Sequence, residues 1–201
     1  MILFGYPVLV YDKVLGNEER DRIHKECMEQ EKTKTKTSAT WECDVYTTCW
    51  DSDMHEDPKF KEPLCIFTDK VKHFLTVHGV DEDPLLQMAW FNSYTKEQFQ
   101  DQHIHSGTHV SAVYFLSAPE GSAPLKFHHP SPPNVPIAFN FENDYLKEQR
   151  YINSVDDRLI VFLSHTPHSV PQGYNEESRY SIAINYGVTN RNNYKATQLP
   201  S

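Results

Sequence analysis

The hydrophobic pattern of the first 80 residues predicts a short strand and two helices. The apolar run at residues 8–11 has the length and composition of a strand. Asn17 precedes an acidic turn and then apolar residues at helical spacing, which predicts a helix over about residues 17–31. Residues 60–77 repeat apolar side chains every three or four positions, and Gly79 follows as a helix stop.

From residue 84 onwards the pattern changes to short apolar runs separated by turns that contain Pro and Gly. The expected strands are residues 86–94, 109–117, 125–128, 137–141, 158–163 and 180–188. Large aromatic side chains on these strands are expected in the core: Trp90, Tyr114, Phe115, Phe162 and Tyr186. Regularly spaced strands after a helical start predict a mainly β fold with flanking helices, either a sandwich or a jelly roll.

Length and composition fit one acidic domain. The chain has 201 residues, 38% of them hydrophobic, and a formal net charge of -9. That charge disfavours a diffuse binder of nucleic acid or of anionic membranes. We expect a single domain over residues 1–201, with a helix-bearing part at 1–80, a β core at 84–190 and a tail at 191–201.

The chain also lacks the signals of export. No apolar stretch reaches the length of a membrane span, and the N-terminus has neither a basic region nor a cleavage site. Cys27, Cys43, Cys49 and Cys65 form no C-x-x-C pair, so we expect reduced thiols rather than a zinc ribbon. An oxidised Cys43–Cys49 pair is the less favoured alternative. The sequence therefore predicts a cytoplasmic protein.

The first cluster with metal-binding chemistry is Asp101-Gln102-His103-Ile104-His105. In an extended chain, alternation places Asp101, His103 and His105 on one face. His168 lies shortly after the apolar run at residues 158–163, so it supplies an imidazole at the end of another strand. Two neighbouring donors and one distant donor form a facial three-ligand site that leaves coordination positions open.

Other histidines allow alternative assignments. His165 could replace His168 as the distal ligand, although the residues around His168 favour the latter. Residues 128–129 precede a proline and are expected to close a turn. Strict alternation would place His109 on the same face as His105, but a turn at residues 106–107 is expected to break that alignment.

The second cluster is Arg179-Tyr180-Ser181. Alternation places Arg179 and Ser181 on a face with small residues, and it places tyrosines and isoleucines on the opposite face. A guanidinium beside a hydroxyl suits a narrow pocket that binds a carboxylate. Arg179 could instead pair with Glu176 or Glu177, but the small residues beyond it favour the pocket.

The order H-x-H, a β-rich interval, a distal His and R-x-S resembles the Fe(II)/2-oxoglutarate-dependent oxygenases. The similarity is greatest to oxygenase-like proteins of bacteria and phages in the prolyl-hydroxylase-like branch. The segments that carry it are Trp90-Phe91-Asn92-Ser93-Tyr94, His103-Ile104-His105, residues 111–116, residues 162–170 and residues 179–185. The resemblance covers roughly residues 84–188 and implies a double-stranded β-helix, the cupin-like jelly roll.

The resemblance also implies roles for particular residues. The implied Fe(II) ligands are His103, His105 and His168, and the implied 2-oxoglutarate contacts are Arg179, Ser181, Tyr94 and Asn92. The family places a carboxylate two residues after the first His, where this chain has His105. Either His105 binds the metal, or Asp101 supplies the carboxylate, or His105 lies outside the coordination sphere and two His ligands remain. We favour His105 because its spacing is that of the family.

The expected activity is that of a 2-oxoglutarate-dependent dioxygenase, a hydroxylase whose chemistry is centred on the iron. It would hydroxylate a C–H bond of a protein, peptide or small molecule and release succinate and CO2, with 2-oxoglutarate and dioxygen as cosubstrates. The alternatives are a cupin-type dioxygenase or isomerase that does not use 2-oxoglutarate, and a non-enzymatic jelly-roll module. We expect no membrane or nucleic-acid partner, and a cytoplasmic location that is the host's if a phage encodes the chain. The sequence leaves open the substrate and the oligomeric state, for which a homodimer is one option.

Overall fold

The computed structural model describes residues 5–33, 45–50, 54–129 and 148–188, and the structural statements below concern these residues. The elements in chain order are β1 Val8–Asp12, α1 Asn17–Thr33, β2 Tyr46–Thr47, the 3-10 helix η1 Pro58–Phe60, α2 Lys61–Val77, β3 Pro84–Tyr94, β4 Gln100–His103, β5 Val110–Ser117, β6 Leu125–His128, β7 Gln149–Ile152, β8 Arg158–Leu163, β9 His168–Val170 and β10 Arg179–Val188.

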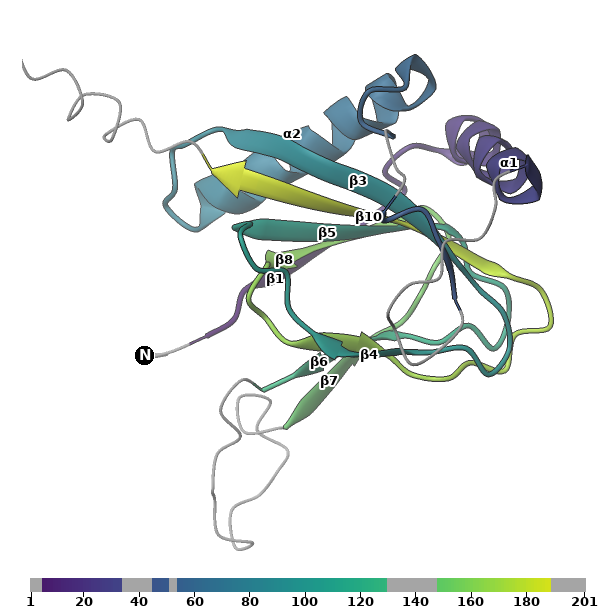
Figure 1. Cartoon of the computed structure of the whole chain (residues 1–201). Coiled ribbons are helices and arrows are strands. Elements are labelled where there is room, and N and C mark those ends of the chain that lie inside the picture. The colour runs from purple at the N-terminus through teal and green to yellow at the C-terminus, as the bar shows by residue number, and fades with distance from the viewer. Residues whose placement is uncertain (1–4, 34–44, 51–53, 130–147, 189–201) are drawn as a thin grey trace, which may run out of the picture.

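The strands form two antiparallel sheets that face each other, with both helices outside the larger one (Figure 1). The larger sheet has the strand order β1-β8-β5-β10-β3-β2, and the smaller has the order β4-β9-β6-β7. This is the mainly β architecture with flanking helices that the sequence predicts, and its two sheets are those of a double-stranded β-helix.

Two apolar clusters hold the layers together. One lies between the helices and the larger sheet, where Phe67 and Phe74 of α2 pack in one cluster with Ile182 and Ile184 of β10. The other lies between the two sheets and includes Phe162. Alternation along β10 therefore sends its apolar side chains to the helices and leaves its opposite face for the space between the sheets, as predicted.

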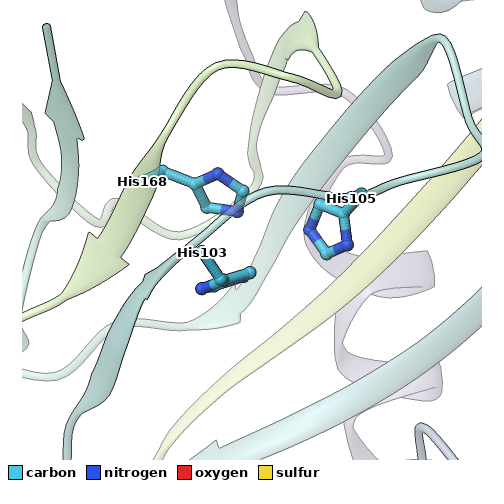
Figure 2. A group of neighbouring side chains, drawn as sticks. All are labelled: His103, His105 and His168. Carbon is cyan, nitrogen blue, oxygen red and sulfur yellow. The ribbon is translucent and has the colours of Figure 1, made fainter. Parts of the chain in front are cut away.

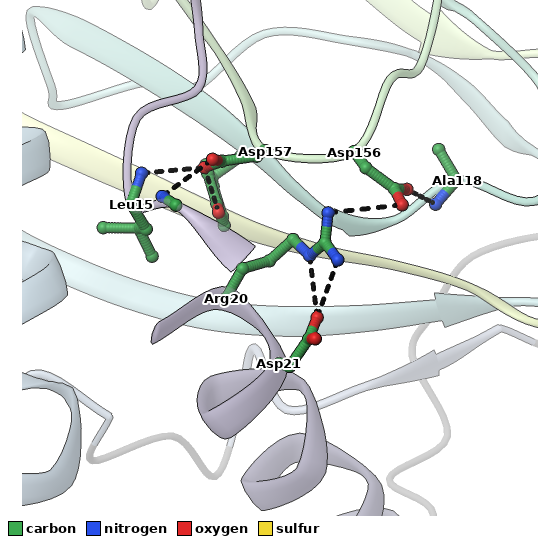
Figure 3. A network of polar contacts seen from close by, with 8 residues as sticks. Leu15, Arg20, Asp21, Ala118, Asp156 and Asp157 are labelled. Atoms are coloured by element: carbon green, nitrogen blue, oxygen red, sulfur yellow. Dashed lines mark hydrogen bonds and ion pairs between the residues drawn. The ribbon is translucent and has the colours of Figure 1, made fainter. Parts of the chain in front are cut away.

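The N-terminal segment is tied to the larger sheet by a buried carboxylate (Figure 3). Asp157 accepts hydrogen bonds from the backbone N–H groups of Leu15 and Gly16, each at 2.8 Å, and from the Tyr114 hydroxyl at 2.7 Å. The backbone of Asp157 has a φ of 60°, which is a costly conformation for a residue with a side chain. These three hydrogen bonds hold it there and connect the turn before α1 to β5.

Most of the predicted elements are confirmed to within two residues of their expected ends. The exceptions are β2, β4, β7 and β9, which are short and were not predicted as strands. Sequences such as Gln100-Asp101-Gln102-His103 have little apolar character, so only pairing with a neighbouring strand makes them β. The strand expected at residues 137–141 lies outside the described residues.

Two smaller expectations concern the cysteines and membranes. Cys27, Cys49 and Cys65 are free thiols, while Cys43 lies outside the described residues. Within the described part of the chain, no helix has the length and apolar character needed to cross a bilayer.

Candidate metal centre and adjoining cavity

Three imidazoles from two separate segments meet between the sheets (Figure 2). His103 ends β4, His168 begins β9, and the antiparallel register pairs these two residues directly. His105 follows two residues after His103. One ring nitrogen from each histidine lies within 4.8 Å of the other two, and the ring centroids are 4.3–5.1 Å apart. This spacing allows all three residues to bind one ion.

Backbone carbonyls orient two of the rings. Nδ1 of His103 lies 2.8 Å from the carbonyl oxygen of Asp101, and Nδ1 of His168 lies 2.9 Å from that of Thr166. A carbonyl only accepts hydrogen bonds, so each Nδ1 carries the proton and donates, which leaves the Nε2 lone pair free. Such contacts are typical of histidines that bind metals.

His105 lies beyond the end of β4 and is positioned by Ser164. The backbone N–H of His105 donates to the Ser164 carbonyl at 2.9 Å. The Ser164 hydroxyl accepts from Thr108 at 2.8 Å and is hydrogen-bonded to Ser111 at 2.9 Å. Ser164 itself lies in the turn between β8 and the strand of His168. One buried serine therefore links the segments that carry His105 and His168.

Asp101 does not join the cluster. Its side chain is exposed, and only its backbone carbonyl faces His103. The pairing of β4 with β9 shifts register between Gln100 and His103. A shift of this kind breaks the strict alternation that would have placed Asp101 and His103 on one face.

The alternative histidines also lie elsewhere. His165 is exposed, and its ring packs edge to face against Tyr6 at 5.8 Å. Nδ1 of His109 accepts a hydrogen bond from the Val188 N–H at 3.1 Å. Nε2 of His128 is 2.8 Å from the Ser169 hydroxyl. None of these three rings belongs to the group that can share an ion.

Burial keeps the three clustered imidazoles neutral. Loss of solvent lowers the pKa of His103, lowers that of His105 to about 4 and lowers that of His168 to about 3, with further lowering from the neighbouring rings at His105 and His168. Neutral imidazole is the form that binds metal ions. The cluster contains no carboxylate, so it would leave the charge of a divalent ion unreduced.

The same three histidines line a narrow cavity between the sheets. Two strands of the larger sheet supply its other wall through side chains of alternate residues: Trp90, Asn92 and Tyr94 of β3, and Arg179, Ser181 and Ala183 of β10. The antiparallel register pairs Trp90 with Ala183 and Tyr94 with Arg179. The ring of Trp90 contacts that of His105 at 5.8 Å, so the guanidinium lies further along the cavity from that imidazole.

Arg179 is the only formal charge among the residues described as lining this cavity. Its side chain is 2% exposed and donates through Nη1 to the Ala123 carbonyl at 2.9 Å. Nη2 lies 3.5 Å from the Ser181 hydroxyl, and the guanidinium carbon lies 4.5 Å from the centre of the Tyr94 ring. No carboxylate within the described chain pairs with it, and burial lowers its pKa to about 10. A buried cation of this kind is costly unless an anion joins it.

Three buried polar atoms along the cavity have no hydrogen-bond partner in the described chain: Trp90 Nε1, Asn92 Oδ1 and Arg179 Nε. Unsatisfied buried polar groups are rare, and a missing ligand is one of their ordinary explanations. The donors and the acceptor therefore fit a small polar molecule, and the imidazoles fit a metal ion beside it.

The prediction that Trp90 is buried in the core is confirmed, but this side chain also lines the cavity. Its side chain is 4% exposed, but it belongs to the cavity wall and not to either apolar cluster. The sequence indicated this position, because alternation along β3 places Trp90 on the same face as Asn92 and Tyr94. Tyr114, Tyr186, Phe115 and Phe162 lie in the apolar clusters as expected.

Comparison with known families identifies the chain. Residues 88–185 match the family described as "Putative 2OG-Fe(II) oxygenase". The chain belongs to this oxygenase family. The match runs from β3 to β10 and contains all three clustered histidines and Arg179. Membership makes the protein an oxidoreductase and implies Fe(II), 2-oxoglutarate and dioxygen, which decides among the three function classes left by the sequence.

Solved structures agree with this oxygenase in fold. A Pseudomonas putida prolyl-4-hydroxylase is 16% identical with a TM-score of 0.63, and the match covers 92% of this chain and 94% of that one. HygX from Streptomyces hygroscopicus, solved with nickel, 2-oxoglutarate and hygromycin B, is 15% identical with a TM-score of 0.64, covering 90% and 83%. A viral collagen prolyl hydroxylase from Paramecium Bursaria Chlorella virus-1 is 15% identical with a TM-score of 0.58, covering 90% and 96%. No curated protein matches the sequence.

Proposed function

We propose that the oxygenase binds Fe(II) through His103, His105 and His168, and that it hydroxylates a C–H bond of an organic substrate. Arg179 and Ser181 bind the far carboxylate of 2-oxoglutarate, and Asn92 and Tyr94 line the path between that carboxylate and the metal. The observation that carries the proposal is that three neutral imidazoles and one buried, unpaired guanidinium open into the same cavity.

Each residue has a role that follows from its contacts. The Arg179 guanidinium offers a planar fork of donors, and its free Nε and its position over Tyr94 hold it ready for a carboxylate. The Tyr94 hydroxyl donates to the Gln100 side chain at 2.9 Å, so it would have to turn away from Gln100 to donate to a carboxylate. Apolar walls such as Val113 and Leu125 exclude water from the reacting groups.

The charges of the site favour a dianionic cosubstrate. Three neutral imidazoles leave a bound Fe(II) with its full positive charge, and Arg179 adds a second cationic group in the same low-dielectric cavity. A dicarboxylate such as 2-oxoglutarate neutralises much of this charge with one group at each end. A site that used a neutral cosubstrate would have no use for the buried guanidinium.

When bound, Fe(II) and 2-oxoglutarate supply the oxidising chemistry: dioxygen gives one oxygen atom to the substrate C–H bond and one to succinate, with release of CO2. The chain itself binds, orients and shields the reactants. The structural relatives include prolyl hydroxylases and a protein crystallised with hygromycin B. The proposal therefore covers protein, peptide and small-molecule substrates.

Metal titration of single variants tests the ligands. Mn(II) or Fe(II) binding under anaerobic conditions should be lost in His103→Ala and His168→Ala and unchanged in His165→Ala, whose ring is exposed. A second pair decides the middle ligand: His105→Ala should weaken binding, whereas Asp101→Ala should not. Full metal binding in both His103→Ala and His168→Ala would overturn the ligand assignment.

Turnover tests the reaction. The wild-type protein with Fe(II) and air should convert 2-oxoglutarate to succinate, at a slow basal rate that candidate substrates accelerate. The His103→Ala variant is the matched negative control. Absence of both 2-oxoglutarate binding and succinate formation in metal-loaded wild type would reject the proposed function.

A further inference from the structure

The tryptophan in the cavity wall carries an unused hydrogen-bond donor. Nε1 of Trp90 is buried and has no partner among the described residues. Of the three unpartnered atoms along the cavity, Asn92 Oδ1 and Arg179 Nε belong to residues already placed in the cosubstrate site. Trp90 has no role so far.

The position of Trp90 places this donor at the metal end of the cavity. Trp90 pairs across β3 and β10 with Ala183, and its ring lies against that of His105 at 5.8 Å. Arg179 pairs with Tyr94, four residues further along β3, which corresponds to roughly 13 Å of strand. The small Ala183 side chain opposite the indole leaves room for a ligand. The wall of β3 and β10 thus has one unsatisfied donor near the imidazoles and another on Arg179.

The chemistry of indole restricts what can satisfy this donor. Indole Nε1 only donates, so its partner must be an acceptor. The neighbouring imidazoles would use their lone pairs for the metal, and no described group accepts a hydrogen bond from Trp90 Nε1. A phenyl ring would fill similar volume without leaving a buried polar atom unpaired. The N–H therefore points to an acceptor on a ligand.

We propose that Trp90 is a cosubstrate-binding residue whose indole N–H donates to the carboxylate of 2-oxoglutarate next to the three imidazoles. Arg179 and Ser181 bind the other carboxylate, so each end of the dicarboxylate has its own donor. This inference rests on the proposed function. It adds a contact that selects a dicarboxylic acid over a ligand that carries only the far carboxylate.

The test measures binding and needs no turnover. Isothermal titration of Mn(II)-loaded protein with 2-oxoglutarate compares wild type with Trp90→Phe, and with Trp50→Phe as the matched control, since Trp50 is 61% exposed and outside the cavity. Trp90→Phe should lose about 10- to 100-fold in affinity for 2-oxoglutarate, the range expected for a hydrogen bond to a charged group. Its Mn(II) affinity should stay within about twofold. Trp50→Phe should match wild type in both.

A second replacement separates the N–H from the ring. Benzothienylalanine at position 90 keeps the bicyclic shape and replaces only the N–H with sulfur, so it should lose the same affinity as Trp90→Phe without a packing change. Unchanged 2-oxoglutarate binding in this variant would overturn the inference. So would an equal loss of Mn(II) affinity, because Trp90 would then act by supporting His105. If metal-loaded wild type itself binds no 2-oxoglutarate, the proposed function fails first, and the inference fails with it.

Discussion

Replacing Arg179 with Met should strongly weaken cosubstrate binding while leaving the stability of the metal-free protein nearly unchanged. Burial lowers the pKa of the guanidinium well below its ordinary value, to about 10. Each pKa unit corresponds to about 1.4 kcal/mol, so burial destabilises the charged guanidinium by ~3 kcal/mol in the folded chain relative to the unfolded chain. Arg179→Met removes that penalty, and Met can fill much of the same space.

The substitution also removes favourable contacts. Arg179 donates to the Ala123 carbonyl and packs on the rings of Tyr94 and Phe115, worth about 1.5–3 and about 1 kcal/mol respectively. The Ala123 carbonyl does not become unsatisfied, because the Ser154 hydroxyl donates to it at 2.6 Å. Gain and loss nearly cancel, so the free energy of unfolding should change by less than about 2 kcal/mol.

Cosubstrate binding should change far more. Truncating one member of a buried charge pair costs about 2–5 kcal/mol, so 2-oxoglutarate affinity should fall by at least about 30-fold. Urea unfolding of the metal-free protein gives the stability, and calorimetric titration of the Mn(II)-loaded protein gives the affinity. Arg158→Met is the matched control, because Arg158 lies outside the cavity and pairs with Asp12. Affinity within threefold of wild type, or a stability loss above about 4 kcal/mol, would refute the reasoning.

Three further predictions concern residues around the site. Ser164→Ala should weaken Mn(II) binding by about tenfold, because its hydroxyl anchors Thr108 in the loop of His105; unchanged affinity in a metal titration contradicts this. Asp157→Ala should lower the free energy of unfolding by about 3 kcal/mol, since the buried Tyr114 hydroxyl and two backbone N–H groups lose their acceptor. Asp157→Asn should cost less in the same urea titration. Burial lowers the pKa of His24, so the folded state opposes its protonation and stability falls as pH drops through about 6.5. His24→Leu in metal-loaded protein should therefore flatten the loss of stability between about pH 7 and pH 5, and an equal slope would count against it.

Local periodicity was enough to predict the elements that bury one face. The helix at Lys61–Val77 and the strand at Arg179–Val188 each have a repeat that matches their geometry. Their buried faces follow from that repeat without any knowledge of neighbours. For the same reason, alternation alone placed Arg179 and Ser181 on a face opposite the isoleucines.

The polar strands could not be predicted from the local sequence pattern. β4 and β7 become strands because each pairs with a neighbour in the smaller sheet, not because their residues favour extended backbone. The register shift between Gln100 and His103 has no sequence signal either. That shift takes Asp101 out of the cluster, although simple alternation placed it beside His103.

By itself, the sequence determined which side chains share a face of the regular strand β10. It also determined which chemical groups the chain can offer: imidazoles spaced by two residues, a distal imidazole, and a guanidinium among small neighbours. Only the tertiary structure decided which of these meet, because strand pairing is a long-range choice. The register of β4 with β9 places His103 opposite His168, and the register of β3 with β10 places Trp90 near His105 and Tyr94 beside Arg179. Burial between the sheets then keeps the imidazoles neutral and the guanidinium in need of an anion, which no local sequence pattern specifies.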